Sequence, residues 1–218
     1  MTGLRFFQPA VGLETDAVFG FYQSFSTEFL WPRTVNEIKS MAEDGQLFAA
    51  ADPNRIVACC YMRPLVDGDV NGVLRHVIDV DDAYEFGGVL VDGAARGQKI
   101  GSTLGRMSLA AVSAMASPSG IIAHVHEENE LPRPLLNRLG FRVTGEKDGP
   151  PFAPPGMKTN SEGNVVGDVY RFEFGRFADI ATWLEEYAGV VGGRPAELSA
   201  ILSRSEVASD LRALAEHA

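Results

Sequence analysis

Residues 89–105, with the sequence VLVDGAARGQKIGSTLG, decide which fold this chain is expected to adopt. An apolar run that begins at Tyr84 ends just before Asp92-Gly93. A short glycine-bearing turn follows, and the residues after it are apolar at helical spacing. The stretch therefore predicts a strand, a tight turn and a helix. The apolar stripe of that helix consists of Ile100, Leu104, Met107, Ala111 and Met115.

The turn at the start of this helix has the features of an anion site. Glycines let backbone N–H groups approach a ligand closely, and a helix N-terminus adds unpaired N–H groups and a positive dipole end. We therefore expect a pyrophosphate cradle. The spacing of Gly93, Gly97 and Gly101 excludes the Rossmann fingerprint, and a Walker A loop is excluded because no Gly-Lys-Ser/Thr follows. An ordinary strand-to-helix connection rich in small residues is the alternative.

Residues 96–101, RGQKIG, resemble motif A of the Gcn5-related N-acetyltransferases, the GNAT family, whose members bind acetyl-coenzyme A. The usual form is Arg/Gln-x-x-Gly-x-Gly/Ala, and this chain carries Lys99 where the first motif glycine usually lies. A lysine at that position requires an unstrained φ. A second similarity lies downstream, where a strand candidate at 121–126 precedes Asn129, and Gly140-Phe141 closes a helix eleven residues later. The resemblance covers roughly residues 3–175.

The resemblance implies an α/β (α+β) architecture, the GNAT fold. This fold has a central mixed, mostly antiparallel twisted sheet that is splayed between two parallel strands and flanked by helices. We expect this acyl-CoA-binding domain over residues 1–175 and a C-terminal helical extension over 176–218. The extension has two apolar helical stripes, which must be buried on the core or on a second subunit, so a homodimer is one of two expectations.

The remaining patterns predict the elements around the central stretch. Helices are expected over 15–30 and 34–43, with a capping box formed by Thr34 and Glu37. Asp52-Pro53-Asn54 predicts a turn between two strands. The 21 residues from Asp148 to Asp168 hold four prolines and four glycines and predict a long functional or disordered loop. Strands are expected over 4–7, 46–51, 55–63 and 165–174.

Composition narrows the class of protein. The chain has 218 residues, of which 45% are hydrophobic and 22% charged, as in an ordinary globular domain, and it has no membrane-spanning run or signal-peptide pattern. The adjacent Cys59 and Cys60 cannot staple distant segments, so they indicate a reducing, cytoplasmic compartment or simply a buried strand. The net charge of −10 argues against nucleic acid as a partner. The acidic charge is compatible with a cationic amine acceptor and equally with solubility alone. The acidic segment 66–82 is either a solvated loop or a surface that attracts a cationic substrate.

Glu85 is the candidate catalytic base. An N-acetyltransferase must remove a proton from an ammonium whose pKa is about 10. In the members of the family that acetylate histones, a glutamate base occupies the matching strand at a similar distance from motif A. Burial among Tyr84, Phe86 and Val89 is expected to raise the pKa of Glu85. The alternatives are a solvent-facing strand residue or a partner of an arginine.

The general acid is less well defined by the sequence. Many relatives carry a tyrosine four residues before the glycine of the Gly-Phe pair, and this chain has Leu136 there. Tyr84 and Tyr170 are the alternatives from neighbouring strands.

His124 and His126 lie on one face of their predicted strand. Each is either a packed histidine or a group that deprotonates or orients an acceptor. They are not expected to hold a metal, because no third ligand of suitable spacing accompanies them.

The resemblance also implies contacts with acetyl-CoA. The backbone of Val89, Leu90 and Val91 is expected to pair with the pantetheine arm, next to a bulge at Gly87-Gly88. Asn129 is expected to touch the pantetheine or the far end of the coenzyme. The pyrophosphate is expected on the backbone N–H groups of Arg96, Gly97, Gln98, Lys99, Ile100, Gly101 and Ser102.

We therefore expect an N-acetyltransferase that moves an acetyl group from acetyl-CoA to a primary amine of a small molecule or peptide by direct attack. The alternative is a catalytically weak acyl-CoA-binding or sensing module that acts through a protein partner. Lys99 and Leu136 favour the module, whereas Glu85 and the long loop favour the enzyme. The acceptor, the acyl group and the oligomeric state stay open at this point.

Overall fold

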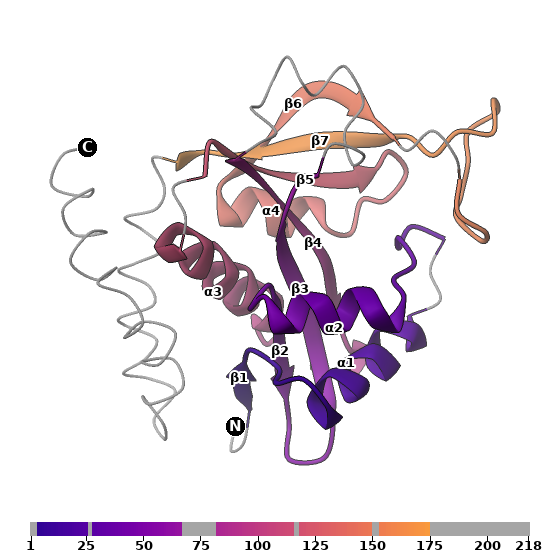
Figure 1. The fold of residues 1–218 in the computed structure, drawn as a ribbon. Helices are drawn as coiled ribbons and strands as arrows, with labels where there is room; N and C mark the ends of the chain where they lie inside the picture. The colour runs from indigo at the N-terminus through magenta and orange to yellow at the C-terminus, as the bar shows by residue number, and fades with distance from the viewer. Residues whose placement is uncertain (1–3, 26–27, 67–81, 116–117, 150–152, 175–218) are drawn as a thin grey trace, which may run out of the picture.

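The computed structural model describes residues 4–25, 28–66, 82–115, 118–149 and 153–174 (Figure 1). The expected C-terminal extension and most of the acidic segment 66–82 lie outside these residues. The described elements run in the order β1 (Arg5–Phe7), α1 (Leu13–Ser24), α2 (Val35–Glu43), β2 (Leu47–Ala51), β3 (Ile56–Pro64), β4 (Ala83–Val91), a 3-10 turn (Gly93–Ala95), α3 (Ile100–Met115), β5 (Gly120–His126), α4 (Arg133–Leu139), β6 (Phe141–Asp148) and β7 (Gly167–Phe172).

The strands form one mixed sheet in the order β1-β2-β3-β4-β5-β7-β6. The β4–β5 pair is parallel, and the other neighbours in this sheet are antiparallel. In Figure 1, β2, β3 and β4 run down the molecule while β5, β7 and β6 run across its top, so the two halves are strongly twisted against each other. The predicted mixed, mostly antiparallel sheet is confirmed.

Helices cover both faces of the sheet, because the strands alternate apolar side chains on both sides. Side chains of α3 and α4 share one core cluster with Phe48, Cys60 and Phe86. Side chains of α1 and α2 share a second cluster with Cys59 and Tyr61. Cys59 and Cys60 are both buried and free, which confirms their interpretation as small apolar residues on a buried strand. None of the described helices is long and apolar enough to cross a membrane.

The two parallel strands part soon after they meet. β4 pairs with β5 at Ala83, Tyr84 and Glu85, and the last register pair joins Glu85 to Ile122. β4 continues to Val91 and β5 to His126, but no register pair joins these described stretches. The splayed sheet that the resemblance implied is therefore present, and Glu85 lies at the point of divergence.

A bulge accompanies this divergence. The register of β3 against β4 shifts between Cys59 and Tyr61, and Gly88 has a φ of 59°. A Cβ at either Gly87 or Gly88 would lie 2.5 Å from an atom of the Tyr61 side chain. Glycine is therefore required here both for backbone freedom and for the space that Tyr61 occupies. The bulge predicted at Gly87-Gly88 is confirmed.

The first helix is shorter than predicted. α1 ends at Ser24 because Phe25 has left the helical region, with φ −93° and ψ 74°. The hydroxyl of Ser24 donates to the carbonyl of Phe21, a local bond that competes with continuation of the helix. The segment after α1 is held against this helix by Tyr22, whose hydroxyl donates to the carbonyl of Trp31 at 2.7 Å.

The predicted ends of two other helices are confirmed. Thr34 caps α2, and its side chain and that of Glu37 form the expected capping box. Gly140 ends α4 in the left-handed conformation, with φ 97°.

Candidate active site

The turn between β4 and α3 exposes backbone donors at a helix start. The first helical hydrogen bond of α3 is donated by the N–H of Thr103 to the carbonyl of Lys99, at 3.0 Å. The N–H groups of Ile100, Gly101 and Ser102 precede it, and the first N–H groups of a helix lack intrahelical acceptors. These donors belong to the segment for which a pyrophosphate contact was predicted.

The same turn requires two left-handed residues. Gly97 has a φ of 79° and Lys99 a φ of 62°. The expectation of an unstrained φ at Lys99 was therefore wrong. A residue with a Cβ in this region costs about 1–2 kcal/mol, and glycine costs much less. Lys99 has this strained φ because the chain bends into α3 at this residue. The family motif has glycine at the same position.

The helix start lies against the diverging part of β4. A Cβ at Gly101 would lie 3.4 Å from Cγ2 of Val91 and 3.8 Å from Cγ1 of Val89, so the glycine allows close packing. The same position lies 3.5 Å from Leu135 of α4. The structure thus brings the residues predicted at 89–91 next to those at 96–102.

Asn129 lies at the end of β5 and is part of a turn. Its N–H donates to the carbonyl of His126 at 2.8 Å, and its Oδ1 accepts from the N–H of Leu131 at 3.3 Å. The side-chain oxygen therefore shapes the entry to α4. No described contact joins Asn129 to the β4–α3 turn.

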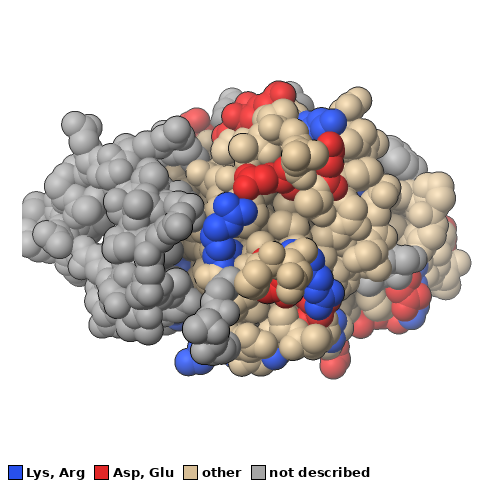
Figure 2. Space-filling model, turned by 90° about the horizontal axis from the view of Figure 1, so that it is seen from below, with Lys and Arg blue, Asp and Glu red and all other residues tan. Residues whose placement is uncertain are grey.

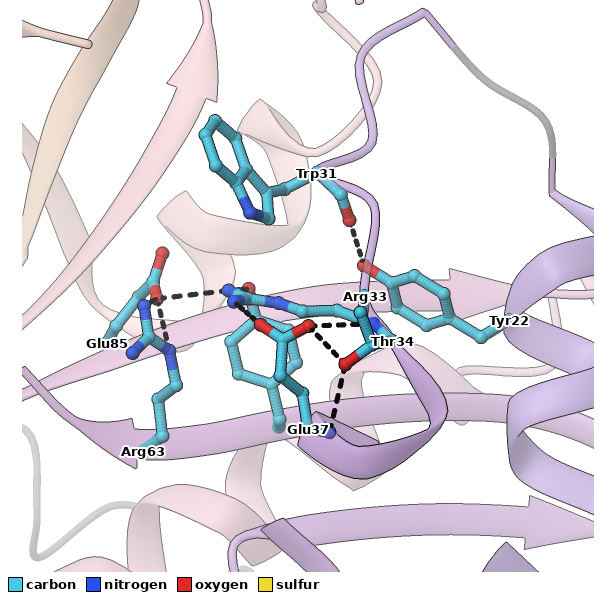
Figure 3. Close-up of polar contacts among 8 residues, drawn as sticks. Tyr22, Trp31, Arg33, Thr34, Glu37, Arg63 and Glu85 are labelled. Carbon is cyan, nitrogen blue, oxygen red and sulfur yellow. Dashed lines mark hydrogen bonds and ion pairs between the residues drawn. The ribbon is translucent and has the colours of Figure 1, made fainter. Parts of the chain in front are cut away.

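On the opposite side of the divergence, Glu85 lies in a cluster of charged side chains (Figure 3). Its Oε2 accepts from Nε of Arg63 at 2.9 Å and lies 2.7 Å from Nη2 of the same arginine. Arg33 reaches the same oxygen from the segment before α2, at 3.7 Å. Arg33 also donates to the hydroxyl of Tyr61 and pairs with Glu37. Two arginines thus hold one oxygen of Glu85.

The second oxygen of Glu85 faces a histidine. Nδ1 of His124 lies 3.5 Å from Oε1 of Glu85, and Nε2 lies 3.4 Å from Oδ2 of Asp148. Asp148 is the last residue of β6, and its side chain is 3% exposed. The three side chains therefore form a line from β4 through β5 to β6.

This cluster reverses the expected pKa of Glu85. Burial by itself raises the pKa of the carboxyl, but contact with His124 and the charges of Arg63, His124 and Arg33 outweigh it and lower the pKa to about 2. The prediction of a raised pKa was wrong, because burial among apolar neighbours is not the whole environment of this residue. The arginine pairing that the sequence left open is present.

His124 is shifted in the opposite direction. Burial by itself lowers the pKa of the imidazole, but its contacts with Asp148 and Glu85 outweigh burial and raise the pKa to about 9. At neutral pH the ring is therefore an imidazolium between two carboxylates.

His126 is a packed histidine. Its Nδ1 accepts from the N–H of Glu128 at 3.2 Å, so its Nε2 carries the proton that bonds to the carbonyl of Lys158 at 3.1 Å. The ring also contacts that of Phe29, with centroids 5.0 Å apart. The N–H of Lys158 in turn donates to the carbonyl of Glu28. The long loop after β6 is thereby joined to the segment before α2, beside the cluster that contains Glu85.

Neither Tyr84 nor Tyr170, the two alternatives for the general acid, is on the face of Glu85. Leu136 is buried in the core, as are Tyr170 and, in part, Tyr84. Alternation along β4 places Tyr84 on the face opposite its neighbour Glu85.

The part of the surface that the structure describes is not uniformly acidic. Figure 2 shows acidic and basic side chains in small separate groups among uncharged residues on the face seen from below. No group of three or more His, Cys, Asp or Glu residues within the described ranges is suited to hold a metal ion.

Solved structures share this arrangement of strands and helices. A GCN5-related N-acetyltransferase from Kribbella flavida has a TM-score of 0.54 at 19% identity, over 78% of this chain and 96% of that one. Arabidopsis thaliana NAA60 in complex with a bisubstrate analogue has a TM-score of 0.53 at 12% identity, over 78% and 97%.

This chain has the GNAT fold. A third example is the NatC complex bound to Gag peptide and CoA, which has a TM-score of 0.51 at 13% identity, over 78% of this chain and 98% of that one. The neighbours with this fold include N-acetyltransferases that act on different substrates. No protein-family model and no curated protein matches the sequence.

Sequence reasoning missed four members of the cluster around Glu85. They come from three separate segments: Arg33 precedes α2, Tyr61 and Arg63 lie on β3, and Asp148 ends β6. One signal was available, because the paired glycines at 87 and 88 leave room for a large side chain on the neighbouring strand.

Proposed function

We propose that this chain is an N-acetyltransferase that moves an acetyl group from acetyl-CoA to a primary amine of a small molecule or peptide. One observation carries the proposal. β4 and β5 part directly after Glu85, next to a helix start with open backbone donors. The parting strand edge can pair with an extended amide-containing arm, and the helix start suits a pyrophosphate. The residues present therefore fit a coenzyme A thioester.

The coenzyme side is built from the backbone. Val89, Leu90 and Val91 are proposed to hold the pantetheine arm through the edge of β4 that faces the gap. The backbone from Arg96 to Ser102 is proposed to hold the pyrophosphate, with the ammonium of Lys99 as an added cation, and Asn129 is proposed to line the coenzyme's path beside α4. Among the neighbours, the NatC complex contains CoA, which supports a ligand of this kind.

The acceptor side is built from side chains. Glu85 is proposed as the catalytic carboxylate that binds the acceptor ammonium at the mouth of the gap. Its pKa of about 2 keeps it ionised at any working pH, which suits binding of a cation. The same low pKa makes it a weak terminal proton acceptor. After the ammonium loses one proton to solvent, the amine attacks the thioester carbon directly. A C–N bond forms as the C–S bond breaks, and the thiol leaves with the second amine proton.

Two observations favour the alternative, a coenzyme-binding module that acts through a protein partner. Glu85 is paired with two arginines, and Leu136 lies buried where a tyrosine acid would be expected. Such a module would bind acetyl-CoA without turning it over. A homodimer and a cytoplasmic location are further parts of the proposal, and the sequence is their only support.

Thiol release separates the two functions. The full chain is incubated with acetyl-CoA and, in turn, tryptamine, spermidine and an alanyl peptide with a free N-terminus. We expect amine-dependent release of free thiol in equal amount to an acetylated product identified by mass spectrometry. If acetyl-CoA binds but none of these amines causes release of free thiol, the result would instead support the module.

A further inference from the structure

His124 is the titratable group of the site to which the proposed function gives no task. It lies two residues beyond Ile122, the residue opposite Glu85, so its side chain is on the same face of the sheet. Its side chain is 24% exposed and its Nε2 is buried, so an approach from solvent is to the remaining part of the ring. Both of its ring nitrogens face carboxylates, and these carboxylates belong to two other strands.

The contacts of His124 are long. Separations of 3.5 Å and 3.4 Å exceed the 2.7–2.9 Å that is usual for hydrogen bonds between charged groups. By contrast, the arginine nitrogens lie 2.7 Å and 2.9 Å from the other oxygen of Glu85. The imidazolium is therefore held mainly by charge between the two carboxylates, and another cation with N–H donors can compete for them.

Asp148 has unused capacity. Its Oδ1 is buried and has no hydrogen-bond partner among the described residues, although the side chain is 3% exposed. A buried carboxylate oxygen without a donor costs free energy until a donor reaches it. Gly167 lies beside Asp148 in the register and carries no side chain, and on its other side it pairs with His126, two residues from His124.

We infer that His124 is the proton acceptor for the substrate, and that the substrate's own ammonium prepares it by taking over the carboxylates of Glu85 and Asp148. This inference rests on the proposed function and adds the base that it lacks. It selects an acceptor with a primary ammonium, because several N–H donors are needed to reach both carboxylates.

The protons balance over one turnover. The arriving ammonium displaces the imidazolium's proton into water, because a second positive charge beside the same carboxylates favours the neutral ring. Neutral His124 then takes a proton from the ammonium. The amine attacks the thioester carbon, the C–S bond breaks, and the second amine proton passes to the sulfur. The imidazolium is restored, and one proton per turnover is left in solution.

Other charged groups that the structure describes near His124 also bear on its charge. Glu85 and Asp148 contact the ring, and His126 on the same strand is satisfied by backbone groups. The further charged groups are Arg63 on β3 and Arg33 before α2, which pair with Glu85, and Arg171 on β7, opposite Ile122.

Imidazole titration followed by nitrogen-edited NMR tests the inference on the full chain. The probe is n-butylammonium chloride, and tetramethylammonium chloride at equal concentration is the control, because it has no N–H to donate. The signals of His124 are identified by their loss in His124→Gln. We expect the pKa of His124 to be about 9 with the control and to fall toward about 6.5 with the probe. The same pKa of His124 in both salts would overturn the inference.

Two variants keep the test decisive if His124→Gln does not fold. Asp148→Asn removes one carboxylate and should lower the pKa of His124 even without the probe. His126→Gln is the matched control on the same strand and should leave the titration of His124 in place. An unchanged titration in Asp148→Asn would contradict the inference.

Acetyl-CoA binding is measured on the same samples. If acetyl-CoA binds and butylammonium leaves His124 unchanged, the inference alone fails. If acetyl-CoA does not bind, the proposed function fails whatever the imidazole does.

Discussion

The two sides of the diverging strands are built in different ways. The proposed coenzyme side consists of backbone donors of one continuous stretch, the β4–α3 turn, whose shape depends on Gly97 and Lys99 in left-handed conformations. The acceptor side uses charged side chains from several separate segments, among them Arg33, Arg63 and His124, which meet around Glu85. On this proposal, a ligand of the first side would be recognised by donors in one turn, whereas the second side would depend on the balance of charges brought together by the fold.

This difference predicts that the two sides fail separately. A change in the charged cluster should lower turnover and leave coenzyme binding intact. A change in the turn should weaken coenzyme binding and leave the charged cluster intact. The predictions below test this separation, from the largest expected effect to the smallest.

Replacement of Glu85 by Gln should have the largest effect. The amide keeps the size of the side chain but removes the charge that both arginines and His124 contact. We expect turnover to fall by about 10²-fold, since a lost hydrogen bond between charged groups costs up to about 3 kcal/mol. Calorimetry should show unchanged affinity for acetyl-CoA.

Glu173→Gln is the matched control for that variant. Glu173 is an exposed residue that pairs with Arg142 at the surface, at 3.7 Å. Its replacement should leave turnover within a few-fold of the wild type, because exposed ion pairs contribute little. Equal turnover of the wild type and of Glu85→Gln across the pH range would remove Glu85 from the mechanism.

Replacement of Gly97 by Val should break the other side. Gly97 has a φ of 79°, a conformation that costs a β-branched residue about 1–2 kcal/mol or more. The turn should therefore leave this shape, and acetyl-CoA affinity should fall by about tenfold, the equivalent of about 1.4 kcal/mol. The titration of His124 should stay as in the wild type.

The control for this variant is Gly93→Ala. Gly93 lies in the same turn, but its φ is not left-handed and nothing lies within 4 Å of the added Cβ. Coenzyme affinity should be unchanged. Similar losses in Gly93→Ala and Gly97→Val would show that the left-handed turn is not what binds the coenzyme.

The charged cluster should also set how stability depends on pH. The pKa of Glu85 is lowered from 4.5 to about 2, so its contribution is complete above 4.5 and is lost as pH falls toward 2. The pKa of His124 is raised from 6.5 to about 9, so its contribution is complete below 6.5 and is lost as pH rises through 9. Thermal unfolding midpoints should therefore be highest between about 4.5 and 6.5.

The alkaline part of this profile has a direct check. In His124→Gln, the loss of thermal stability between 6.5 and 9 should disappear, since the titrating group is gone. An alkaline loss of the same size in the variant would show that another group is responsible.

The smallest expected effect is at Lys99. Glycine there removes the strain of φ 62° but adds conformational freedom to the unfolded chain. The net gain in the free energy of unfolding should be about 0.5 kcal/mol, the difference between these two contributions. Gln98→Gly, next to it and without a left-handed φ, should instead lose a similar amount. Urea unfolding of both variants tests the sign, and destabilisation by Lys99→Gly would contradict the account of strain.

The strand, turn and helix from β4 to α3 could be predicted, as could the sheet, because their signals are local. The apolar run of β4, the small residues of the turn and the stripe of α3 follow one another in the sequence, and the structure places these elements as expected. The bulge at Gly87-Gly88 could be predicted for the same reason, since the register shift lies within one strand pair.

The acceptor side could be predicted only in part. Glu85 was identified from its strand, but its pKa depends on Arg33, Arg63 and His124, which are distant in the sequence. Burial alone predicts a raised pKa, and the charges that reverse the direction come from tertiary contacts. The end of α1 was missed for a related reason, since Tyr22 and Trp31 are joined only when the chain turns back.

Calorimetric titration of the wild-type chain with acetyl-CoA, beside CoA and dephospho-CoA, is the most direct test of the central claim. The account predicts micromolar binding of acetyl-CoA and a loss of affinity in Gly97→Val but not in Glu85→Gln. The absence of binding at millimolar acetyl-CoA would contradict it, because the open donors at the start of α3 and the gap beside β4 would then not form a coenzyme site.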